Sequence, residues 1–161
     1  MDTFLTWIEL SALGRFMRES GAWTYPIVNL LHLLGVSTLF GSVVVIDLAL
    51  VGVWSRSARP ALAQAASRVT AGGFILATFT GIGLLASNAT EYRGNPFFAI
   101  KFPAIAAGLA NAILVRRSAG WRALQTRALT AAEDRQIARF GVISLVSWFV
   151  AVAAGRLIGY W

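Results

Sequence analysis

Several kinds of residue are scarce in this sequence of 161 residues. Cysteine is absent, which excludes disulfide bonds and thiolate chemistry. Charged side chains make up 13% of the chain, whereas soluble domains carry about 25%. A chain this short cannot bury so large an apolar share, 57% of its residues, in one water-soluble core. The sequence therefore predicts an integral membrane protein, with the lipid bilayer as its main partner.

Four apolar segments are long enough to cross a bilayer, since a spanning helix needs about 20 mostly apolar residues. They cover approximately residues 25–54, 69–87, 97–115 and 137–160. The alternating pattern of a membrane β-barrel is not seen. Short connections between four spans favour an up-down bundle. We therefore expect an all-α, four-transmembrane-helix bundle in which residues 1–161 form a single membrane domain.

The segment before the first span predicts an amphipathic helix on the membrane surface, over residues 1–21. Phe4, Leu5 and Ile8 recur at helical spacing, and Gly21 is a plausible C-terminal stop. The segment has neither a basic start nor an apolar central run, so we expect no cleavable signal peptide. A frayed polar leader is the alternative.

The arginines predict the orientation of the bundle. The first connection holds Arg56, Arg59 and Arg68, and the third connection holds six more arginines, whereas the second holds only Arg93. Positive charge in short loops stays in the cytoplasm. Thirteen arginines against one lysine favour a bacterial source. The prediction is thus a bacterial inner-membrane protein with both termini outside. The net charge of +7 reflects this topology, and no nucleic-acid-binding fold accompanies it.

Small residues spaced four apart mark each span. They are Ser37 and Gly41; Gly73, Ala77 and Gly81; Ala104, Gly108 and Ala112; and Ala151, Gly155 and Gly159. Such stripes let membrane helices approach closely. We expect helix backbones to meet at Gly108 and at Gly155, while one stripe could instead serve a homodimer.

The third connection, around Trp121 and Leu124, predicts a short helix.

Few polar residues lie inside the spans, and each is costly, at about 2.5–3.5 kcal/mol for a charged side chain. They are Asn29, His32, Asp47, Lys101, Asn111 and Arg156. At about 1.5 Å of rise per residue, the three basic side chains in this set fall at one depth, about 8–9 Å from the outer boundary. This shared level, on three helices, points to a cationic site in the outer half of the membrane.

Each of these residues also has a purely structural interpretation. Lys101 and Arg156 are shallow enough to reach the outer headgroups. Asp47 is expected to pair with an arginine such as Arg56 or Arg139. Asn29 and Asn111 fit interhelical hydrogen bonds. His32, the only histidine, is either a packing residue or a ligand, proton site or quinone contact.

Two stretches, "LHLLGVSTLFGSVVVIDLALVG" and "NPFFAIKFPAIAAGLANAI", resemble an uncharacterised family of four-span bacterial membrane proteins. The positions that carry the resemblance are His32, Asp47, Asn95, Pro96, Phe98, Lys101 and Asn111. The family is distantly similar to copper-resistance membrane domains of the D type, which implies metal or haem chemistry at membrane histidines. This chain departs from the copper proteins in having no further histidine, no cysteine and no methionine cluster.

Two functional hypotheses follow. In the first, His32 Nε2 is a metal ligand to the iron of haem b, Lys101 and Arg156 meet the propionates, and Asn29 lies one turn above. The role would be electron transfer, with a quinone as a variant ligand. One histidine per chain means that bis-histidine ligation needs a second protomer, so we expect a homo-oligomer or a subunit of a larger membrane complex.

The alternative hypothesis is a membrane protein with no bound cofactor. It would be a non-catalytic subunit, an assembly factor, or a passage for a small solute or metal. The sequence contains no nucleophile triad and no paired-carboxylate site, so we expect no independent catalytic activity.

Overall fold

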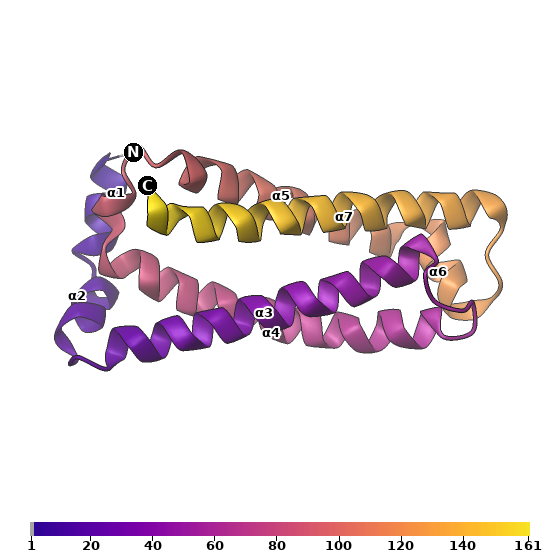
Figure 1. Cartoon of the computed structure of the whole chain (residues 1–161), viewed down its shortest axis with the longest axis horizontal. Helices are drawn as coiled ribbons and strands as arrows, with labels where there is room; N and C mark the ends of the chain where they lie inside the picture. The colour runs from indigo at the N-terminus through magenta and orange to yellow at the C-terminus, as the bar shows by residue number, and fades with distance from the viewer. Residues whose placement is uncertain (1) are drawn as a thin grey trace.

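The computed structural model describes residues 2–161, and these residues form helices and turns without a strand. Four helices are long and apolar enough to cross a membrane. They are α3 (Thr24–Val51), α4 (Arg59–Ser87), α5 (Pro96–Arg117) and α7 (Ala131–Leu157), which the short 3₁₀ helix η2 (Ile158–Tyr160) extends. The predicted all-α four-helix bundle is confirmed (Figure 1).

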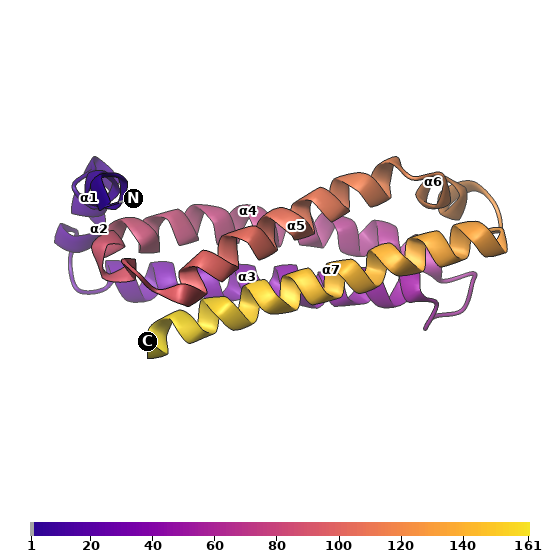
Figure 2. The ribbon, with the colours of Figure 1, turned by 90° about the horizontal axis from the view of Figure 1, so that it is seen from above.

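The bundle consists of two helical hairpins, α3 with α4 and α5 with α7 (Figure 1). The hairpins meet mainly through α3 and α7, and α7 crosses over α3 diagonally (Figure 2). The two helices lie close together at the end that carries the first and third connections, which we call the α6 end. They diverge toward the opposite end, where both chain termini lie and which we call the terminal end (Figure 1).

Glycine allows the closest helix contact, between α3 and α4. A Cβ on Gly73 would lie 2.5 Å from the backbone nitrogen of Leu39, and one on Gly35 would lie 2.7 Å from that of Ala77. The two backbones therefore touch, as close packing of membrane helices through small residues requires. Ser37 and Gly41, the predicted pair on this span, are exposed instead.

The predicted backbone contacts at Gly108 and Gly155 are wrong, because a side chain fills the space beside each glycine. A Cβ on Gly108 would lie 2.9 Å from the ring of Trp148. Gly155 faces the aliphatic chain of Lys101. Trp148 also packs with Leu39, Val43 and neighbouring apolar residues in the middle of the bundle.

Two spanning helices begin earlier than hydropathy predicts. Helix α4 starts at Arg59 rather than near residue 69, with Pro60 in its first turn, where proline is tolerated. Helix α7 starts at Ala131 rather than near residue 137, because Thr130 and Glu133 form a capping box. Both extra segments carry polar side chains. These side chains interrupt the apolar run from which a span is predicted, but the helix continues through them.

The N-terminal segment forms two short helices, α1 (Asp2–Glu9) and α2 (Ala12–Glu19), where the sequence predicts one. Ser11 separates them, because its hydroxyl accepts a hydrogen bond from the Gly14 backbone and caps α2. Met1, the first residue of the predicted helix, lies outside the described residues. Both helices lie across the terminal end of the bundle (Figure 1).

Polar contacts attach these short helices to the bundle. Arg18 donates to the carbonyls of Ala86 and Ser87 at the C-terminus of α4, where a cation is favoured. The carboxylate of Glu9 accepts a 2.7 Å hydrogen bond from the backbone of Thr90 in the 3₁₀ helix η1 (Ala89–Tyr92). This bond lowers the pKa of Glu9 below its ordinary value.

The α6 end is closed by a short helix, α6 (Ala119–Thr126), which confirms the helix predicted in the third connection. Ser118 caps it by accepting a hydrogen bond from Trp121. Leu124 of α6 packs with Leu50, Val115 and Ile137 in a buried apolar cluster.

Candidate functional site

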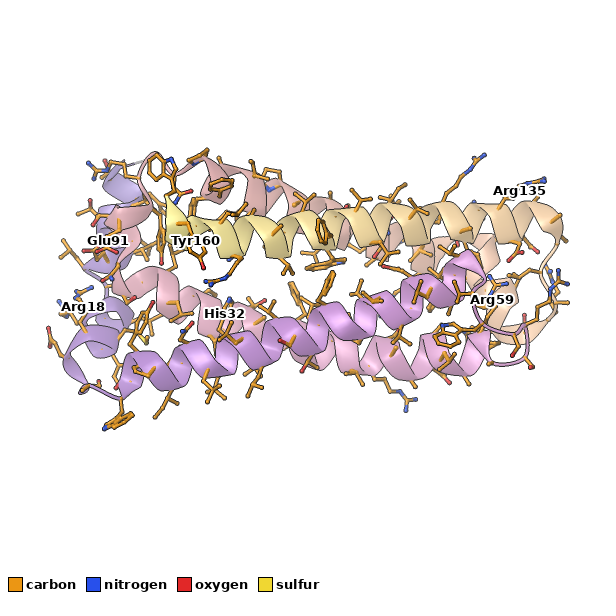
Figure 3. All side chains as sticks on the ribbon, in the orientation of Figure 1. Arg18, His32, Arg59, Glu91, Arg135 and Tyr160 are labelled. Carbon is orange, nitrogen blue, oxygen red and sulfur yellow. The ribbon has the colours of Figure 1, made fainter. Side chains whose placement is uncertain are left out.

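His32 lies in the terminal half of α3 and its ring is turned toward α4. Nδ1 lies 3.0 Å from the carbonyl oxygen of Ala77 and 3.1 Å from the hydroxyl oxygen of Thr80. Figure 3 shows His32 in this half of the bundle, far from Arg59 and Arg135 at the α6 end. The two contacts fix the ring against its neighbouring helix.

These contacts assign the proton of the neutral ring. A carbonyl oxygen only accepts hydrogen bonds, so Nδ1 carries the proton and donates it. The Thr80 hydroxyl gives its own proton to the carbonyl of Leu76, at 2.6 Å, and can therefore only accept from His32. Nε2 is left with a free lone pair, and no described residue forms a hydrogen bond with it.

Gly81 makes room for the ring. A Cβ at this position would lie 3.0 Å from His32 Cε1, which is tighter than ordinary van der Waals contact. The small residues of the predicted stripe on α4 therefore have two different structural roles. Ala77 lies against the α3 backbone, while Gly81, one turn further, accommodates the imidazole.

Lys101 of α5 lies in the same half of the bundle as His32, within range for a charge on its ammonium group to act on the imidazole. The lysine is half-buried, and its side chain lies across Gly155 of α7. A Cβ on Gly155 would lie 3.6 Å from both Cε and Nζ of Lys101, so the helix surface supports the lysine without touching it tightly. The site thus combines an imidazole from one hairpin with an ammonium group from the other.

Arg156 is not part of this pair. It is exposed, and its guanidinium lies 4.7 Å from the centre of the Tyr160 ring and donates a hydrogen bond to the Tyr160 hydroxyl. A cation over an aromatic face is attracted by the ring's quadrupole. Tyr160, a partner that the sequence did not reveal, therefore holds the arginine at the end of α7.

Asn29 lies on α3 one turn nearer the chain terminus than His32, and it is half-buried. Its side chain forms no hydrogen bond with residues 2–161, so the predicted interhelical bond is not found there. The same prediction is confirmed for Asn111, which donates to the carbonyl of Phe140 at 3.0 Å.

Aromatic rings gather beside the site at the terminal end. Tyr92 stacks on Phe98 with 5.5 Å between ring centres, and Phe98 meets Phe102 edge to face at 4.8 Å. Burial raises the pKa of the Tyr92 hydroxyl, and nearby Tyr25 and Glu91 raise it further. Phe98 and Phe102 lie on α5, three residues before and one residue after Lys101, so the aromatic cluster shares its helix with the lysine.

Asp47 lies deep in the bundle, away from this site, and the prediction that it pairs with Arg56 or Arg139 is wrong. The side chain is 2% exposed and lies beside the hydroxyl of Ser144 on α7, and its Oδ2 has no partner among the described residues. The buried cation at this end is Arg59, which is engaged elsewhere. It donates to the carbonyls of Ala49 and Leu50 and forms a 2.8 Å ion pair with Asp134.

Residues 4–161 match the family of unknown function DUF6644. The chain belongs to this family. No curated protein and no solved structure matches it. Membership of DUF6644 covers nearly the whole chain, including all four spans, and agrees with the resemblance to an uncharacterised family.

Proposed function

We propose that this DUF6644 protein is a bacterial inner-membrane protein that binds a redox or anionic cofactor at His32 and Lys101. Haem b, in an electron-transfer role, is the leading candidate, and a quinone is the variant. The observation that carries the proposal is the fixed tautomer of His32, whose Nδ1 is held by Ala77 and Thr80 while Nε2 keeps its lone pair.

This arrangement is the one that metal-binding histidines use. A ligating histidine usually donates its second ring N–H to a carbonyl or carboxylate, which fixes the ring and makes the free nitrogen more basic. The Ala77 carbonyl supplies that contact here. A bound haem would supply redox chemistry at its iron, and His32 Nε2 would be the residue that holds that iron.

Lys101 provides the second feature that a haem or another anionic ligand needs. Lys101 is half-buried, and an ammonium group forms strong, charge-assisted hydrogen bonds with a carboxylate such as a propionate. Asn29, half-buried and without a partner among residues 2–161, offers a neutral polar contact one turn above the ring. Arg156 is committed to Tyr160, so we assign it a weaker role at the edge of the site.

One chain would supply a single histidine ligand to a haem. A second histidine ligand would have to come from a second copy of the chain. The distant similarity to copper-resistance domains that the sequence suggests would imply related metal chemistry, although one imidazole alone is a poor copper site. The role that follows is cofactor retention and electron transfer within a homo-oligomer or a larger complex, without independent catalysis.

The proposal is tested by analysing what copurifies with the protein from a haem-producing bacterial host. Solvent extraction and mass spectrometry should find haem b or a quinone in the wild type and neither in His32→Ala. Lys101→Ala should retain the ligand about tenfold less well, because a charge-assisted contact contributes about 1.5–3 kcal/mol. Arg156→Ala should change retention less than Lys101→Ala does. Equal ligand content in the wild type and His32→Ala would refute the proposal.

A second candidate function is that of a subunit without a cofactor, and an exposed face of α3 favours it. Ser37 and Gly41 both point away from the bundle, and a Cβ on Gly41 would meet nothing within 4 Å. Small residues on an outward face allow a helix of another protein to approach. Gly41→Leu should then dissociate a complex that size-exclusion chromatography detects for the wild type, while ligand content stays unchanged.

A further inference from the structure

A pocket of about 390 Å³ lies at the α6 end of the bundle, remote from His32. It is formed by the connection between α3 and α4, the end of α6 and the first turn of α7. Its lining includes three arginines, Arg56, Arg59 and Arg127, and one acidic side chain, Asp134. Figure 3 shows Arg59 at this end, opposite the end where His32 lies.

The three arginines differ in how far their charges are already engaged. Arg59 is 4% exposed, and each of its three guanidinium nitrogens is engaged, by the carbonyls of Ala49 and Leu50 and by Asp134. Arg127 forms two hydrogen bonds with the carboxylate of Glu133, at 2.9 and 2.7 Å, although half of its side chain remains exposed. Arg56 is exposed and has no ion pair or hydrogen bond with any residue that the structure describes. The free cationic charge at the pocket is therefore that of Arg56.

We propose that this pocket binds a phosphate group, with Arg56 as its principal cationic contact and the Arg127 guanidinium at its rim. A guanidinium presents paired N–H donors that match phosphate oxygens. Ser57, Gln125 and Thr126 supply further polar atoms to the lining. Arg59 has a positioning role, since it ties the end of α3 to the first turn of α7.

The surroundings favour a phosphodiester of an acidic phospholipid over a soluble phosphate compound. The pocket lies where spanning helices end, which is where lipid headgroups are expected around such helices, and its lining also contains Pro60, Leu124 and Leu129. Basic pockets between spanning helices on the cytoplasmic side suit anionic headgroups. Val51 and Val53, at the end of α3 and the start of the connection that lines the pocket, are exposed apolar side chains and offer a surface for acyl chains.

Native mass spectrometry of the full chain, released from detergent micelles, tests the proposal. The probes are phosphatidylglycerol, phosphatidylcholine and inorganic phosphate, each added separately to the wild type, Arg56→Gln, Arg56→Lys and Arg116→Gln. Arg116 is the matched control, because it is exposed at the same end but does not line the pocket. Circular dichroism checks that each variant keeps its helices.

We expect one phosphatidylglycerol to bind the wild type preferentially over phosphatidylcholine. Arg56→Gln should weaken this binding about fivefold. Arg56→Lys should weaken it by a smaller factor, because the charge remains while the paired N–H donors are lost, and Arg116→Gln should leave it nearly unchanged. Arg56-dependent binding of inorganic phosphate alone would also support the phosphate site and would assign it to a soluble ligand. Equal losses of binding in Arg56→Gln and Arg116→Gln would overturn the proposal. So would a wild-type protein that binds phosphatidylglycerol no better than phosphatidylcholine and does not bind inorganic phosphate.

Discussion

At the scale of single residues, His32 shows both what the sequence predicts and what it cannot. Its isolation inside an apolar span was enough to single it out as a possible ligand. The nitrogen that stays free could not be predicted, because it depends on the Ala77 carbonyl and the Thr80 hydroxyl, more than forty residues away. Arg156 shows the opposite case. Its depth matched that of Lys101, but depth says nothing about direction, and the neighbouring Tyr160 decides where the guanidinium lies.

Replacing Thr80 by valine tests the support of His32 without touching the imidazole. Thr80→Val removes one of the two acceptors at Nδ1 and leaves the Ala77 carbonyl, so the ring should be held less firmly. Loss of such an outer contact typically weakens metal binding 10–100-fold, and we expect about tenfold here. The measurement is a titration of the purified protein with haem, followed by its absorption.

Thr70→Val is the control for this change. Thr70 bonds Ser42 at the same α3–α4 contact but does not reach His32. Similar affinities for haem in the two variants would mean that Thr80 only stabilises the helix pair.

At the scale of helices, the sequence predicts that small residues matter but not which helices they join. The stripes on α5 and α7 suggested backbone contact, yet Trp148 occupies the space beside Gly108. A bulky side chain on one helix can fill the space beside a glycine on another helix. The spacing of small residues along a single helix does not show whether a backbone or a side chain fills that space. Gly35, which touches α4, lay outside the predicted stripe of its own span.

Two adjacent glycines on α4 provide a matched test of the α3–α4 contact. A Cβ on Gly73 would collide with the backbone of α3, whereas one on Gly72 would meet nothing within 4 Å. Gly73→Ala should lower the free energy of unfolding by about 1–3 kcal/mol, the usual effect of overpacking. Gly72→Ala should leave it unchanged or raise it slightly, because alanine favours helix more than glycine does. Thermal melts in detergent distinguish the two, and equal melting temperatures would mean that α3 and α4 are not packed this closely.

At the scale of the whole molecule, the arrangement of charge follows the fold. Nine of the thirteen arginines lie in the first and third connections or in the helical turns beside them. These connections form the α6 end, whereas both termini and the second connection lie at the opposite end (Figure 1). Apolar length and loop charge are local properties, so the sequence predicts the number of spans and their order. The pairing into two hairpins that diverge at the terminal end depends on contacts between distant residues.

Reporter fusions test the orientation that this charge predicts. Fusions after Ser57 and after Arg127 should report the cytoplasm, because basic loops are retained there. Fusions after Glu91 and after Trp161 should report the outside. The reverse pattern at any two of these sites would place His32 in the other half of the membrane and would contradict the proposed orientation.

The absorption spectrum of the purified protein tests the central claim, that His32 Nε2 is a ligand, most directly. Wild-type protein from a haem-producing host, measured before and after reduction, should show a Soret band that shifts on reduction. His32→Ala should lose the band while its circular dichroism keeps the helical signal. A wild-type protein that stays colourless after haem is supplied would exclude haem. A band of equal strength in His32→Ala would show that the haem is held elsewhere and would contradict the account of this site.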